Sequence, residues 1–161
     1  MSTQTKLPAD EPLVVMTRLY DAPRALVWKA ITAPAHVRQW WGGPGFSNPV
    51  CEMDVRPGGR WTHVMRFPDG RELSLDFVFL EVEAPSLLSW QHRDHGQRSE
   101  GPPTSITTIT LEELAEQTRW TMVARFRSLA DREAALALGY SGPIEASSER
   151  LDAYLETMED V

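Results

Sequence analysis

The stretch RQWWGGPGFSNPV (38–50), followed closely by RPGGRW (56–61), places three tryptophans beside two turns rich in glycine and proline. A tryptophan ring is costly to leave in water and large enough to shape any space that it borders. Glycine and proline end helices and form tight turns. The stretch therefore predicts a helix that ends on aromatic rings, in a part of the molecule that is either packed core or the wall of a cavity.

The two neighbouring tryptophans are expected to have different roles. Neighbours on a helix diverge by about 100° around its axis, so Trp40 and Trp41 cannot face the same point. We expect Trp40 to anchor the helix to a sheet and Trp41 to border the mouth of a cavity together with Phe46. The glycine-rich segment after them is then a flexible rim and a candidate entrance.

Two short helices are predicted in front of the glycine-rich segment. Asp21 and Thr32 are typical N-caps, and each is followed by a proline within the first helical turn. The spacing of the apolar residues after them fits one face of a helix. These signals predict helices over 21–32 and 32–41.

The rest of the chain has the pattern of strands followed by helices. Runs rich in β-branched and aromatic residues, separated by turn signals, are typical of an antiparallel meander. The expected strands cover 13–20, 50–55, 60–67, 72–83, 86–94, 104–114 and 118–128. A helix over 128–139 follows. The last helix, 141–160, is amphipathic, with an apolar stripe formed by Ile144, Leu151, Tyr154, Leu155 and Met158.

This order of elements predicts an α+β fold of one domain with the pattern β-α-α-β6-α. A curved antiparallel sheet buries the stripe of a long helix by wrapping around it, and such a sheet encloses more volume than one helix fills. The remaining space predicts an internal hydrophobic cavity. We expect this domain to cover residues 12–161, after a flexible N-terminal tail over 1–11.

Composition excludes several classes of partner. The 161 residues carry a formal net charge of −7, which argues against nucleic acid and anionic membrane surfaces, because both are bound through clustered Lys and Arg. Cys51 is the only cysteine, so no internal disulfide is possible. The sequence shows no signal peptide and no membrane-spanning run. We therefore expect a cytoplasmic protein without a membrane or nucleic-acid partner, and the sequence leaves a homodimer open.

Several segments together resemble a known family. They are DAPRALVWKAITAPAHVRQWWGGPGF (21–46), CEMDVRPGGRW (51–61), MRFPDG (65–70) and FLEVEAPSLLSW (79–90). In these segments the chain is similar to the bacterial branch of the START/Bet v 1 (SRPBCC) superfamily, which is related to the C-terminal domain of the activator of the heat-shock-protein-90 ATPase. The resemblance implies a helix-grip fold with a hydrophobic cavity between the sheet and the last helix. It does not imply one activity, because members include ligand binders, cyclases and chaperone regulators.

Strand alternation predicts which side chains face this cavity. Residues two apart on a strand share a face, and small residues in the last helix leave room beneath it. In the alternative interpretation, the same residues pack against the last helix as ordinary core. The predicted ligand-binding residues are Trp41, Phe46, Trp61, His63, Met65, Phe77, Phe79, Trp90, His92, Trp120, Met122, Ser148, Leu151 and Leu155.

Three side chains are candidates for acid–base chemistry in the cavity: His63, His92 and Glu52. Histidine suits this role because it titrates near neutral pH. A zinc site would need His92, Asp94 and His95, with His63 reaching them across the sheet. However, His92 and His95 point to opposite faces of an extended strand. We therefore predict no metal and no cofactor.

Three functions remain as hypotheses. The leading one is a protein that binds a small hydrophobic or aromatic molecule in the cavity, with a stress-related role; six tryptophans in one small domain suit a cavity lining. The second is an enzyme, a cyclase or hydrolase, that acts on such a molecule. The third, a module that regulates a chaperone, rests only on the name of the related domain. A chaperone partner is disfavoured because the sequence lacks the N-terminal domain of the eukaryotic activator.

Overall fold

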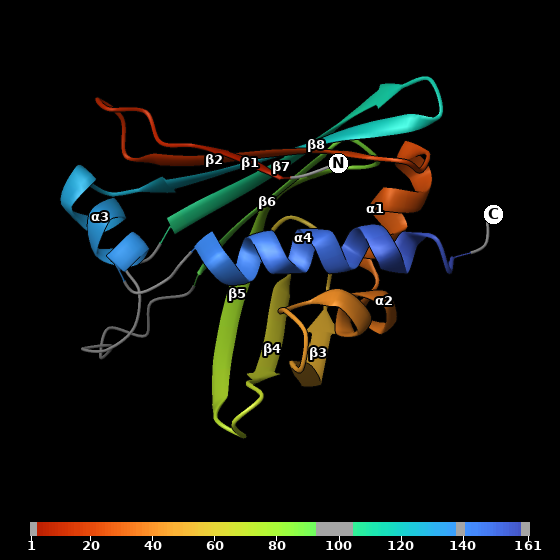
Figure 1. The fold of residues 1–161 in the computed structure, drawn as a ribbon, viewed down its shortest axis with the longest axis horizontal. Helices are drawn as coiled ribbons and strands as arrows, with labels where there is room; N and C mark the ends of the chain where they lie inside the picture. The colour runs from red at the N-terminus through yellow and green to blue at the C-terminus, as the bar shows by residue number, and fades with distance from the viewer. Residues whose placement is uncertain (1–2, 93–104, 138–140, 159–161) are drawn as a thin grey trace.

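The computed structural model describes residues 3–92, 105–137 and 141–158, which form eight strands and four helices (Figure 1). The strands are β1 (Gln4–Lys6), β2 (Leu13–Tyr20), β3 (Ser47–Met53), β4 (Arg60–Arg66), β5 (Glu72–Glu83), β6 (Leu87–His92), β7 (Ser105–Leu114) and β8 (Gln117–Phe126). The helices are α1 (Arg24–Thr32), α2 (Pro34–Trp40), α3 (Leu129–Ala137) and α4 (Ser141–Leu155). None of the helices in these ranges has the length and apolar content needed to cross a bilayer.

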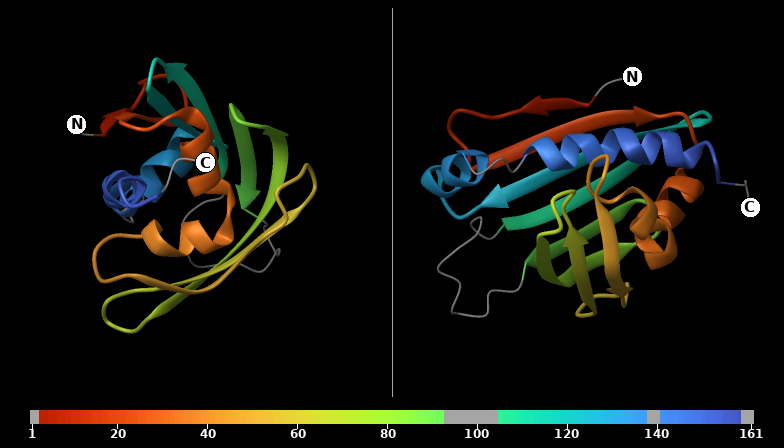
Figure 2. Two further views of the ribbon diagram at one scale, coloured as in Figure 1. Left: turned by 90° about the vertical axis from the view of Figure 1, so that its right-hand side faces the viewer. Right: turned by 60° about the horizontal axis from the view of Figure 1, so that its bottom comes forward.

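All the strands in the described ranges belong to one antiparallel sheet with the order β1-β2-β8-β7-β6-β5-β4-β3. From β3 to β8 each strand pairs with its successor in the chain, as expected of a meander, and β2 joins the other side of β8. The sheet curves around α4, with α1 and α2 near one end of the helix and α3 near the other (Figure 2). The predicted α+β helix-grip fold is therefore confirmed.

The buried side chains of the sheet follow the two-residue period of a strand. In β8, for example, Trp120, Met122, Ala124 and Phe126 are buried and alternate with more exposed residues. α4 faces them with Leu151, which is 1% exposed. Removing a large apolar side chain of this kind from water contributes about 1.5–3 kcal/mol. The core therefore lies on the concave side of the sheet.

The first two helices begin without the polar caps that the sequence predicted. The N-caps are Pro23 and Ala33 rather than Asp21 and Thr32, and neither forms a side-chain capping bond. Thr32 instead donates a hydrogen bond from Oγ1 to the carbonyl oxygen of Trp28, within α1. A fixed proline φ is compatible with the start of a helix, so these helices begin without a capping side chain.

The N-terminal segment differs from the flexible tail that we expected over 1–11. β1 pairs with β2, and Thr5 Oγ1 donates a 3.0 Å hydrogen bond to Glu145 of α4. Arg132 of α3 is buried, and its Nη1 donates to the carbonyl oxygens of Pro8, Glu11 and Leu13. The expectation of a loose tail is therefore wrong for the described part of this segment. A strand of three residues is too short to give a periodic signal.

Candidate ligand cavity

The concave side of the sheet and α4 enclose a cavity of about 340 Å³. Strands β4 to β8 supply about half of the lining residues, and the helices, α4 above all, supply most of the others. The strands bring large aromatic and aliphatic side chains to this space. α4 contributes Pro143, Ile144 and Leu151, and between them the small residues Ser147 and Ser148. The two serines leave space between the helix and the sheet.

Most of the predicted ligand-binding residues lie in the cavity wall. They are Trp41, Trp61, Met65, Phe77, Trp90, His92, Trp120, Met122, Ser148 and Leu151. The wall also contains residues that were not predicted to line it, among them Tyr20, Leu75 and Thr107. Each of these three also lies on the inward face of its strand, so alternation alone identifies the face that they share.

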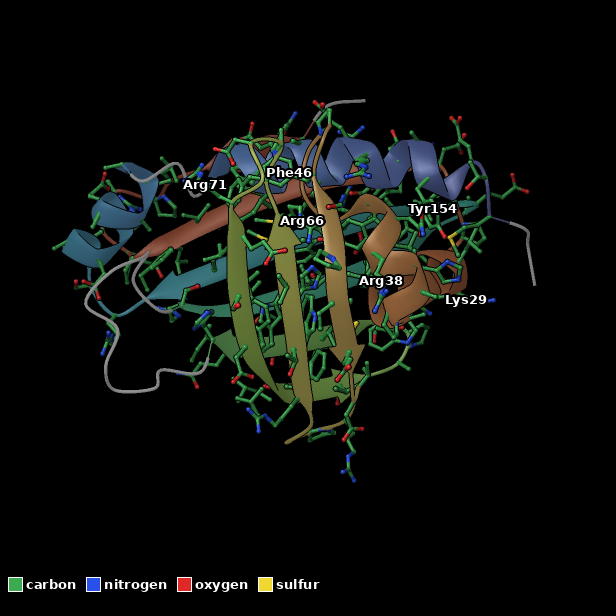
Figure 3. All side chains as sticks on the ribbon, turned by 90° about the horizontal axis from the view of Figure 1, so that it is seen from below. Lys29, Arg38, Phe46, Arg66, Arg71 and Tyr154 are labelled. Atoms are coloured by element: carbon green, nitrogen blue, oxygen red, sulfur yellow. The ribbon has the colours of Figure 1, made fainter. Side chains whose placement is uncertain are left out.

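Phe46, His63, Phe79 and Leu155 were predicted to face the cavity, and they do not line it. Phe79 is stacked against Trp61 at a centroid distance of 6.0 Å. Phe46 packs against Phe67 at 5.0 Å and lies beside α4 at the edge of the sheet (Figure 3). Leu155 is buried in the hydrophobic core. Alternation gives the face of a residue, but it does not say whether another side chain lies between that residue and the cavity.

Trp61 is the centre of an aromatic cluster in the cavity wall. Its ring contacts Trp41 and Trp90 edge-on, at centroid distances of 5.1 and 5.2 Å, and lies 4.7 Å from Phe77. Such pairs contribute about 0.5–1.5 kcal/mol each beyond their burial. The cluster joins the C-cap of α2 to β4, β5 and β6.

The two neighbouring tryptophans, Trp40 and Trp41, have different roles, much as predicted. Trp41 is partly exposed and lines the cavity. Trp40 is buried, and its Nε1 donates a 3.0 Å hydrogen bond to the carbonyl oxygen of Ala30. Trp40 therefore bonds α2 to α1, packs in the core cluster that includes residues of the sheet, and also borders the cavity.

His63 is fully buried in a hydrogen-bonded chain behind the cavity wall. Trp61 Nε1 donates to His63 Nδ1 over 3.1 Å, and an indole nitrogen can only donate. Nδ1 must therefore be unprotonated, so Nε2 carries the proton and donates to Asn48 Oδ1 over 2.8 Å. Asn48 Nδ2 in turn donates to the carbonyl oxygens of Arg38 and Trp41. This series of hydrogen bonds fixes the neutral tautomer of His63 that is protonated on Nε2. It also connects β4 to the end of α2.

The surroundings of His63 oppose its protonation. Burial, and after it the positive charge of Arg38, lower its pKa to about 4. A protonated ring would also place a hydrogen on Nδ1 against the Trp61 N–H. Because both ring nitrogens are engaged and the ring does not line the cavity, His63 does not meet the requirements for an acid–base group that acts on a ligand.

The other two acid–base candidates lie apart from His63. Glu52 is exposed, because the pairing of Cys51 with His63 puts Cys51 on the inner face and Glu52 on the outer face. His92 lines the cavity, with its ring edge-on to Phe77 at 5.3 Å. Strand β5 separates the strands that carry His63 and His92, so the predicted approach of the two histidines does not occur.

Within the described ranges, no group of three or more His, Cys, Asp or Glu residues is arranged to hold a metal ion. Of the residues considered for a zinc site, Asp94 and His95 lie outside these ranges.

The glycine-rich segment that was expected to be a flexible rim is bonded to α4. The backbone N–H of Gly42 donates to Ser147 Oγ over 2.7 Å, and Arg150 Nη1 donates to the carbonyl oxygen of Gly43 over 3.1 Å. Gly42 has a φ of +84°, and a Cβ there would lie 2.8 Å from Phe46 Cβ. Glycine is thus required by both backbone conformation and space. The segment is a fixed link between α2 and α4.

The tyrosine of the cavity wall is uncharged and bonded to α4. Tyr20 donates from its hydroxyl to the carbonyl oxygen of Ser148 over 3.1 Å, and burial raises its pKa. Next to it, Arg18 pairs with Asp152 of α4 at 2.8 Å. These contacts hold α4 against β2 beside the cavity.

Comparison with known proteins agrees with this architecture. The family model of Activator of Hsp90 ATPase homolog 1-like protein matches residues 21–156. A protein from Arthrobacter aurescens has a similar solution structure, with 23% identity, a TM-score of 0.86, and 98% of this chain and 93% of that chain covered. A crystal structure from Mycobacterium smegmatis shows 25% identity and a TM-score of 0.84, with 98% of each chain covered. No curated protein matches the sequence significantly. The chain therefore belongs to the Activator of Hsp90 ATPase homolog 1-like family, within the SRPBCC type of fold that its motifs indicated.

Proposed function

We propose that this protein binds a small hydrophobic or aromatic molecule in the cavity beneath α4. The observation that carries the proposal is an apolar, aromatic-lined space of about 340 Å³ inside the sheet. Ligand sites of this kind are mostly apolar, with few polar groups that fix orientation. The motifs that the chain shares with a superfamily of cavity-containing ligand binders support the same proposal.

The hydrogen bonds around the cavity favour an apolar occupant. Ser147, Ser148 and Tyr20 each donate to a backbone carbonyl oxygen, and the Trp61 N–H donates to His63. These groups have little capacity left to hold water, so the part of the cavity beside them favours an apolar molecule.

Binding is favoured over turnover by the positions of the acid–base candidates. His63 lies behind the wall with both ring nitrogens engaged, and Glu52 lies on the outer face of the sheet. General acid–base catalysis requires a side chain within hydrogen-bond reach of the reacting group. Of the three candidates, only His92 lines the cavity.

Thermal unfolding tests this function. Oleate, flavone and anthraquinone are added separately to the protein, with glucose as a hydrophilic control. A ligand at about 100 times its Kd stabilises the folded state by about 2.7 kcal/mol, and the stabilisation grows with the logarithm of the ligand concentration above Kd. We expect at least one of the apolar compounds to raise Tm with this dependence on concentration and glucose to give no rise. An unchanged Tm with all three apolar compounds up to their solubility limits would contradict the proposal.

A further inference from the structure

We propose that the bound molecule carries a neutral hydroxyl or carbonyl group, which hydrogen bonds to Thr107 at a polar subsite formed with Ser105 and His92. This inference rests on the proposed function and adds the chemical class of the ligand: an amphiphile with an apolar body and one uncharged oxygen. The apolar body would lie against the aromatic wall around Trp61.

The sheet register brings the three side chains of the polar subsite together. Thr107 of β7 is paired with Trp90 of β6, and Gln91 with Ile106. The same antiparallel register places His92 opposite Ser105. Residues that are directly opposite in neighbouring strands point to the same face. All three members of the subsite line the cavity.

Thr107 has an unused hydroxyl at this position. Thr107 is only 6% exposed, and its side chain forms no hydrogen bond with any residue of the described ranges. Thr118, another buried threonine, instead donates to the carbonyl oxygen of Ala22 over 2.7 Å. Buried polar groups normally have a partner, because an unmade hydrogen bond costs free energy. A ligand oxygen supplies the missing partner.

The charges of the wall point to an uncharged ligand group. Among the lining residues of the described ranges, the ionisable ones are Tyr20 and His92; no Lys, Arg, Asp or Glu lines the cavity. Burial keeps the pKa of Tyr20 raised, so that its hydroxyl stays neutral. The described wall offers no Lys or Arg to pair with a carboxylate, and an unpaired carboxylate is strongly disfavoured in apolar surroundings. The hydroxyl of Thr107 both donates and accepts, which suits a hydroxyl or a carbonyl oxygen.

The inference is tested with three compounds of one shape: biphenyl, 4-hydroxybiphenyl and biphenyl-4-carboxylate. Dissociation constants are measured by tryptophan fluorescence for the full chain and for Thr107→Val, which removes the hydroxyl but keeps the shape. Thr108→Val is the matched control, because Thr108 is the next residue on the same strand and lies on the opposite face. Ser105→Ala is a second variant of the subsite, and thermal unfolding of each variant checks that it is folded.

We expect 4-hydroxybiphenyl to bind the unmodified chain about tenfold more tightly than biphenyl, as one added hydrogen bond gives. Thr107→Val should remove most of this preference, measured as the ratio of the dissociation constants of biphenyl and 4-hydroxybiphenyl, and Ser105→Ala should reduce the same ratio. Thr108→Val should leave all three affinities unchanged. Biphenyl-4-carboxylate should bind most weakly.

Several results would overturn the inference. If Thr107→Val prefers 4-hydroxybiphenyl over biphenyl as strongly as the unmodified chain does, Thr107 does not belong to the subsite. If Thr107→Val weakens the binding of biphenyl as much as that of 4-hydroxybiphenyl, the substitution acts through packing and not through a lost hydrogen bond. Tightest binding of the carboxylate contradicts an uncharged ligand group. If biphenyl and 4-hydroxybiphenyl bind the unmodified chain equally well, the polar subsite is refuted but the proposed function is not. If none of the three compounds binds, the result counts against the proposed function as well.

Discussion

Replacement of Gly59 with alanine is expected to destabilise the fold by about 3–5 kcal/mol, a large part of the total stability of an ordinary domain. Gly59 lies in the turn between β3 and β4, and a Cβ on it would lie 1.9 Å from the carbonyl oxygen of Asp54. The turn cannot move away freely, because the Phe79 N–H donates to the Gly59 carbonyl oxygen over 2.9 Å. Urea denaturation measures the loss.

Gly58 provides the matched control for this prediction. It has a φ of +83°, and nothing lies within 4 Å of the position of an added Cβ. Gly58→Ala therefore has only the cost of a left-handed backbone, about 1–2 kcal/mol. If the two variants lose equal stability, the contact between Gly59 and Asp54 does not determine the turn.

Acidification is expected to remove about 3 kcal/mol of stability through His63 alone, because its pKa is lowered from 6.5 to about 4. Above pH 6.5 the ring is neutral in both the folded and the unfolded chain, and the stabilisation is complete. As the pH falls toward about 4, the unfolded chain takes up the proton and the folded chain does not, so stability is lost. Below about pH 4 both states are protonated, and this contribution becomes constant.

His63→Phe separates this contribution from those of other titrating groups. We expect the variant to be less stable at neutral pH, because Trp61 and Asn48 lose a partner, and to lose less stability on acidification than the unmodified chain. His36→Phe is the control. The imidazole of His36 is only partly buried and bonds to Tyr154, so it should account for a smaller part of the pH dependence. An unchanged pH dependence in His63→Phe would contradict the buried neutral ring.

The fold was predictable because its signals are local and repeated. Turn residues separate the strands of the meander, and β2 and β5 have the predicted bounds. Ser128, the first residue of the predicted helix 128–139, accepts a hydrogen bond from the Asp131 N–H at the start of α3. β1 escaped prediction because it is held by pairing with the next strand, β2, and by a hydrogen bond to α4, which is far away in the sequence. Such pairing leaves no trace in a three-residue segment.

The sequence predicts which strand residues face inward, but it does not predict which of them reach the cavity. Alternation put His63 and Phe79 on the inner face, but Asn48 and Trp61 lie against them there. Asn48 was missed because a lone asparagine in a strand gives no signal of the buried bond that it forms. Glu52 was misplaced because its face depends on the register between β3 and β4, which pairs its neighbour Cys51 with His63.

The central claim, that a small apolar molecule occupies the cavity, is tested most directly by filling the cavity. Leu75 of β5 lines it, whereas Leu80 of the same strand is 38% exposed and does not. The measurement is the dissociation constant of the fluorescent probe 1-N-phenylnaphthylamine for the unmodified chain, Leu75→Trp and Leu80→Trp. We predict saturable binding that Leu75→Trp weakens by about tenfold or more and Leu80→Trp leaves unchanged. Equal affinity in all three proteins, or no saturable binding to the unmodified chain, would contradict the claim.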